Sequence, residues 1–206
     1  MPPRNSELER LAGSQLFVLD LRSGQAPKAI AEQLGGPDAQ TPVRWRDADS
    51  ELLVFPAETR VRLAKGFVFV ELTVATDQTG RDTLVFPFRI GSSPDEAVTS
   101  AVSETVPRGN PVIASRWAGV ATPLVWFAIL RAGKGLLARQ RLARPLTVAG
   151  VYTLGRVLSF IFTEPVSAGQ MRDYFTSLSP DDSPPDLPAI TRGHLGTLPL
   201  LRTTDR

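Results

Sequence analysis

The chain has 206 residues, of which 42% are hydrophobic and 21% charged, so it can bury a core of ordinary globular size. Its formal net charge is only +2, which provides no global attraction to nucleic acid or to a membrane surface. The absence of cysteine excludes disulfides, thiolate catalysis and cysteine-ligated metals. The first residues contain no apolar stretch of the secretory type, so we expect a cytoplasmic protein.

The first elements along the chain alternate between strand and helix. Residues 15–21 predict a central strand, because apolar side chains occupy both of its faces. Pro27 to Leu34 predicts a short helix that Gly35 and Gly36 end. The segment 36–50 is polar and contains two prolines, which predicts a loop.

The clearest element is a β-hairpin that ends a meander of strands over residues 51–90. Apolar and polar side chains alternate on both of its strands, and a glycine-containing turn joins them. Pro87 cannot donate a backbone hydrogen bond, so the second strand should be an edge strand or carry a bulge. The side chains expected to face inward are Val68, Val70, Leu72, Val74, Leu84, Phe86, Phe88 and Ile90.

The rest of the chain predicts helices and a second group of strands. We expect helices over residues 94–106, from Thr122-Pro123 onward, and over 166–178, with strands over 146–152 and 155–162. The predicted fold class is therefore α+β, with a mainly antiparallel sheet packed against helices in one globular domain over residues 5–178. Residues 179–206 contain five prolines and few large apolar side chains, which predicts a disordered Pro-rich C-terminal tail.

Two apolar windows are nearly long enough to span a membrane, Val112 to Leu130 and Leu146 to Thr163. Arg156 lies in the middle of the second window, where an arginine costs roughly 2.5–3.5 kcal/mol. Each leucine, isoleucine, phenylalanine or valine returns only about 0.3–0.6 kcal/mol. We therefore predict that these windows are buried in the protein core and that the chain does not enter a membrane.

One short segment resembles a known family. Ala29-Ile30-Ala31-Glu32-Gln33-Leu34-Gly35 looks like the first helix and turn of helix-turn-helix DNA-binding proteins, and residues 41–45 loosely match the recognition helix that would follow. The resemblance implies a helix that enters the major groove. Pro37 and Pro42 would interrupt that second helix, so we do not base a function on it.

Residues for catalysis are sparse. The one histidine, His194, lies in the predicted tail, where nothing would position it. Asp47, Asp49 and Glu51 match only half of a calcium-loop pattern, and the segment 128–135 lacks the first glycine and the hydroxyl of a phosphate loop. We therefore predict no metal and no cofactor. The alternative, a small carboxylate-based enzyme, would use Asp20, Asp47 or Asp49.

Two groups of residues are candidates for binding. A basic segment without acidic residues can contact phosphates, or it can be a solvated helix face. It consists of Arg131, Lys134, Arg139, Arg141 and Arg144. Spaced leucines in a disordered tail can dock into a groove on a partner. They are Leu195, Leu198, Leu200 and Leu201.

These observations favour a non-enzymatic protein-interaction or assembly protein. The partner would be another protein or a second copy of the chain, captured in part by the tail. A carboxylate-based enzyme remains one alternative. Nucleic-acid binding through the basic segment 131–144 remains the other.

Overall fold

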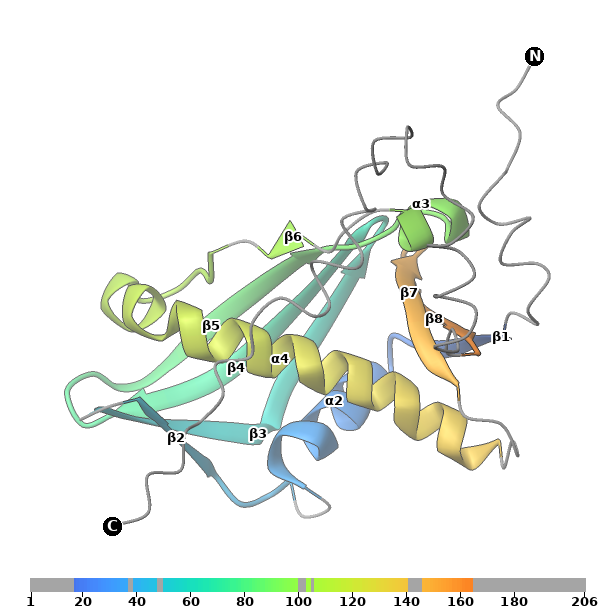
Figure 1. Ribbon diagram of the computed structural model, residues 1–206. Helices are drawn as coiled ribbons and strands as arrows, with labels where there is room; N and C mark the ends of the chain where they lie inside the picture. Colours follow the sequence, from blue (N-terminus) through green and yellow to red (C-terminus); the bar gives the residue numbers. More distant parts are fainter. Residues whose placement is uncertain are drawn as a thin grey trace, which may run out of the picture.

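The computed structural model contains two antiparallel sheets packed against helices, which confirms the predicted α+β class (Figure 1). The predicted tail lies outside the part of the chain that is described. The structure describes residues 17–36, 39–47, 50–99, 103–104, 106–140 and 146–164.

The larger sheet has five strands in the order β2-β3-β4-β5-β6. Its central strands form the predicted hairpin, in which Val70 lies opposite Phe86 and Leu72 opposite Leu84. All eight side chains expected on the inward face are buried, none more than 4% exposed. The strands are β2 (Val43–Asp47), β3 (Ser50–Ala64), β4 (Phe67–Thr76), β5 (Gly80–Arg89) and β6 (Ser103–Glu104).

The prediction from Pro87 that the second hairpin strand is an edge strand or carries a bulge was wrong, because β5 pairs with both β4 and β6 and has no register shift against β4. Val85 exchanges backbone hydrogen bonds with Arg108 on the outer side of β5, both at 2.8 Å. Alternate residues of a strand direct their N–H groups to the same side, so the missing N–H of Pro87 also belongs to that outer side. Among the described residues, β5 pairs on that side with the two-residue strand β6 and, at Val85, with Arg108. The sheet therefore loses little pairing at the proline.

The smaller sheet has three strands in the order β1-β8-β7. They are β1 (Phe17–Arg22), β7 (Thr147–Thr153) and β8 (Val157–Thr163). The prediction that β1 is central and covered on both faces was wrong. Among the described residues β1 pairs only with β8, and Val18 is 47% exposed.

Three helices pack on these sheets: α2 (Ala26–Gly35), α3 (Pro94–Thr99) and α4 (Pro111–Arg139). Helix α4 crosses the inward face of the large sheet and reaches the small sheet, and α2 lies beside it (Figure 1). The expected start at Thr122 was wrong, because Asn110 caps the helix by accepting a hydrogen bond from the N–H of Val112 at 3.0 Å. Pro123 lies inside the helix.

Two further predictions were wrong. The helix expected over residues 94–106 ends at Thr99, and Ser103–Glu104 pairs with β5 as a strand. The loop expected over residues 36–50 contains β2, in which arginines alternate with Val43 and Trp45. This strand also occupies the place where the helix-turn-helix resemblance implied a recognition helix, so the resemblance carries no structural weight.

Helix α4 is the one helix in the described ranges that is long and apolar enough, by length and composition, to cross a membrane. Half of its most apolar window is buried inside the protein. Trp126 on this helix packs against Phe88 of β5, with ring centroids 5.3 Å apart. The inward side of α4 therefore forms part of the core.

Candidate functional site

The outward face of the large sheet carries an unusual combination of arginine and phenylalanine. Directly opposed residues of an antiparallel pair point to the same face. Arg62 lies opposite Phe69, and Phe67 lies opposite Arg89. We call this surface the arginine–phenylalanine face and define it by Phe55, Arg60, Arg62, Phe67, Phe69, Arg81 and Arg89.

The phenylalanine rings lie on two neighbouring strands of the large sheet, β3 and β4. Phe67 and Phe69 stack with centroids 6.0 Å apart and an angle of 18° between the rings. Phe67 is 38% exposed, although exposed phenylalanine is unfavourable unless something covers it. Phe69 and Phe55 are half-buried. The face thus presents aromatic surface to solvent.

Guanidinium groups cover two of these rings. Arg62 lies over Phe69 at 5.1 Å from the ring centroid, and Arg81 lies over Phe55 at 4.1 Å. Such cation–π contacts orient the guanidinium while leaving its outer side available for hydrogen bonds. Phe67 has no such cation in the described part of the chain, so its ring is the most accessible of the three.

The acidic residues on this side of the sheet are already engaged. Glu71 pairs with Arg62 at 2.9 Å and Glu58 with Arg81 at 3.0 Å, while Glu51 contacts two arginines of β2. No described carboxylate lies within 4.0 Å of Arg60 or Arg89. Arginines therefore outnumber acids, and the face carries net positive charge.

One further carboxylate lies near the end of this face. The side chain and the backbone N–H of Ser92 donate hydrogen bonds to Glu96 and lower the pKa of its carboxyl group. Arg89 and Lys65 lower this pKa further from a longer distance. Glu96 is thus held by Ser92 and is not a close ion-pair partner of Arg89.

The sequence contained only a weak signal for this face. The basic residues are spread over several strands, so they form no run along the chain. The alternation of β4 placed Glu71 and Thr73 outward, and the same alternation assigns Phe67 and Phe69 to the outward face. Only the strand register shows that the arginines of β3 and β5 lie next to these rings.

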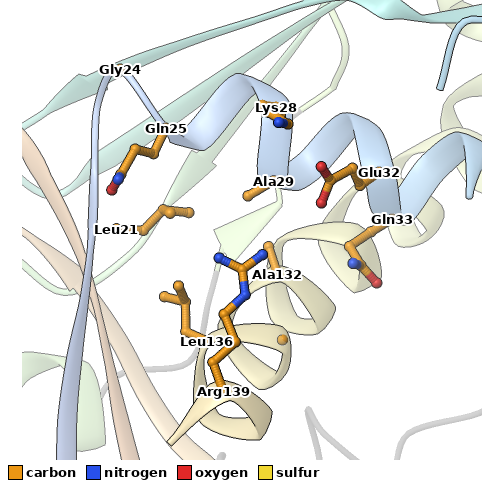
Figure 2. Close-up of a pocket in the computed structure, with 11 residues that line it drawn as sticks. Leu21, Gly24, Gln25, Lys28, Ala29, Glu32, Gln33, Ala132, Leu136 and Arg139 are labelled. Atoms are coloured by element: carbon orange, nitrogen blue, oxygen red, sulfur yellow. The ribbon is translucent and has the colours of Figure 1, made fainter. Parts of the chain in front are cut away.

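A pocket of about 320 Å³ lies between β1, α2 and the end of α4. Figure 2 shows the guanidinium of Arg139 reaching from the last turn of α4 toward α2. The charged side chains that line the pocket are Lys28, Glu32 and Arg139. It contains one carboxylate, and neither Asp20 nor Asp47 is among the residues that line it.

Three residues of the predicted basic segment lie in the described part of α4. Arg131, Lys134 and Arg139 are all exposed, and Arg139 also lines the pocket. At 3.6 residues per turn, Lys134 and Arg139 point about 140° apart around the helix. Arg141 and Arg144 lie outside the described residues, as do the tail leucines Leu195, Leu198, Leu200 and Leu201.

The two described candidate carboxylates, Asp20 and Asp47, lie on different sheets. Asp20 lies on β1 of the small sheet, where its carboxylate accepts a hydrogen bond from the Ser159 hydroxyl at 2.7 Å. Asp47 ends β2 of the large sheet, and Asp49 lies outside the described residues. In the described ranges no three histidine or acidic side chains gather in a group that could hold a metal ion.

Comparisons with family models, curated proteins and solved structures return no significant match.

Proposed function

We propose that this protein is a non-enzymatic interaction protein that docks a negatively charged partner on the arginine–phenylalanine face. The observation that carries this proposal is a sheet face on which arginines outnumber engaged glutamates and flank partly exposed aromatic rings. Aromatic and arginine side chains are the residues enriched where proteins bind partners.

The alternative of a carboxylate-based enzyme has less support. Its acidic candidates lie on separate sheets or outside the described residues, and the pocket holds one carboxylate. The other alternative is nucleic-acid binding through residues 131–144, of which Arg139 lines the pocket while Arg141 and Arg144 lie outside the described residues. Docking through the tail leucines and a cytoplasmic location stay predictions within this proposal.

Charge reversal on the face tests the proposal. We expect the wild-type protein to bind immobilised heparin, a general polyanion, and the double variant Arg60→Glu with Arg89→Glu to elute at much lower salt. The reason is that each reversal removes an attractive charge and adds a repulsive one. Both arginines are exposed, so the fold should tolerate the change.

The matched control is the double variant Arg116→Glu with Arg131→Glu on the exposed side of α4, which has the same net charge. It should elute close to the wild type. Equal shifts for the two double variants, or a wild-type protein that flows through the column, would contradict the proposal.

A further inference from the structure

We infer that the partner of the arginine–phenylalanine face is single-stranded nucleic acid. This inference rests on the proposed function and names its partner. Proteins that bind single strands combine positive charge along the backbone path with aromatic side chains on which bases stack. The arginine–phenylalanine face has both the positive charge and the aromatic side chains on one sheet.

The strand register places the arginines next to the phenylalanine rings. Phe67 lies directly opposite Arg89, and Phe69 directly opposite Arg62. Opposed side chains on neighbouring strands are about 5 Å apart at Cβ. A base stacked on Phe67 would therefore have its phosphate within reach of Arg89 on the adjacent strand.

The exposed ring of Phe67 is the best stacking surface. It is 38% exposed and lacks a covering guanidinium among the described side chains, whereas Arg62 already lies over Phe69. Arg60 and Arg89 have no described carboxylate within 4.0 Å, so phosphates need not displace a protein partner from them. These features make Phe67, Arg60 and Arg89 the central residues of the site.

The shape of the face argues against duplex DNA. Five strands at a spacing of about 4.8 Å form a surface roughly 19 Å wide. The major groove is only about 12 Å wide and admits a helix or a two-stranded ribbon. A broad sheet cannot enter it, and bases paired inside a duplex cannot stack on Phe67. Single strands expose both their bases and their phosphates.

An acidic protein segment could form ion pairs with the arginines, but it has no bases to stack on the phenylalanine rings. The experiment therefore compares probes that share negative charge and differ in bases. Fluorescence anisotropy measures binding of labelled oligothymidylate and oligouridylate of about 12 nucleotides, a length within the range of known single-strand sites. The comparison probes are the duplex of the same length, polyphosphate and polyglutamate.

We expect the single strands to bind more tightly than the duplex, polyphosphate or polyglutamate. Phe67→Ala should weaken single-strand binding by about 5- to 150-fold and leave polyphosphate binding unchanged. The control Phe127→Ala removes a similarly exposed ring, 41% exposed on α4, and should leave all affinities unchanged. Arg60→Ala and Arg89→Ala should each reduce the slope of log affinity against log salt by about 0.7.

Two results would overturn the inference and can be told apart. If polyphosphate or polyglutamate binds as tightly as the single strands and Phe67→Ala has no effect, the partner is a polyanion without bases, and the proposed function stands. If no polyanion binds at all, both proposals fail. Circular dichroism spectra that match the wild type would show that each variant is folded.

Discussion

At the scale of single residues, the start of α3 shows how local chemistry fixes an element. The backbone N–H of Glu96 donates to the Ser93 hydroxyl at 3.2 Å, which is the bond expected of an N-cap residue. Pro94 occupies the first helical position, where its missing N–H costs nothing. The Glu96 carboxylate accepts a hydrogen bond from the backbone N–H of Ser92 at 2.8 Å, so the turn is closed from both directions.

This arrangement predicts a dependence of stability on pH. The pKa of Glu96 is lowered in the folded protein, so the ionised carboxylate contributes to the free energy of unfolding. This contribution is present above the unfolded-state pKa, about 4.3 for glutamate, and is lost as the pH falls through the lower pKa of the folded state. We expect Glu96→Gln to be less stable than the wild type at neutral pH. The difference should shrink as the pH falls below about 4. Urea unfolding at a series of pH values measures the difference in free energy of unfolding between the wild type and the variant. A difference that grows as the pH falls would contradict the prediction.

At the scale of elements, helix α4 is held against the small sheet by a close approach at Gly133. A Cβ atom added there would lie 2.5 Å from the ring of Phe160 on β8. Glycine destabilises the interior of a helix, but α4 continues through both Gly133 and Gly135. Gly133 is needed for its small size, because only a residue without a side chain lets the helix meet the ring.

Two matched substitutions test this interpretation. Gly133→Ala should lower the free energy of unfolding by about 1–3 kcal/mol, because the new methyl group overpacks the contact with Phe160. Gly135→Ala, where no atom lies within 4 Å of the new Cβ, should raise it by about 0.5–1 kcal/mol through helix propensity. Thermal or urea unfolding measures both. Equal changes in the free energy of unfolding would mean that the backbone of α4 at Gly133 does not lie tightly against the ring of Phe160.

At the scale of the whole molecule, the two sheets share one core. The main buried cluster includes Leu72 of the large sheet, Ile129 of α4 and Phe160 of the small sheet. Backbone hydrogen bonds also join the sheets, since Gly91 bonds to both Val151 and Thr153 at 3.1 Å. Neither sheet can therefore lose its packing without exposing apolar surface of the other.

A shared core predicts one cooperative unfolding transition. Tryptophan fluorescence reports β2 and α4, which carry Trp45, Trp117 and Trp126, whereas far-ultraviolet circular dichroism reports all strands and helices. The two signals should give the same urea midpoint. Gly133→Ala should lower both midpoints together. Separate midpoints would indicate that the sheets unfold independently.

Much of the fold was predictable because its patterns are local. The alternation over residues 67–90 predicted the hairpin and its inward side chains, and Gly35-Gly36 predicted the end of α2. The errors arose where local signals were ambiguous. Two dipeptides have the chemistry of a helix start, Thr122-Pro123 and Asn110-Pro111. The helix begins at the earlier one, because residues 111–122 also pack on the core.

By itself the sequence determined the α+β class, the inward face of the hairpin and the scarcity of catalytic side chains. These properties depend on residue type and on periods of two or about 3.6 residues, which are visible along the chain. Only the tertiary structure decided that arginines of β3 and β5 flank the phenylalanines of β4, and that Arg139 turns away from Lys134. Strand register and helix rotation create these neighbours, and both are set by packing between segments that are distant in the sequence.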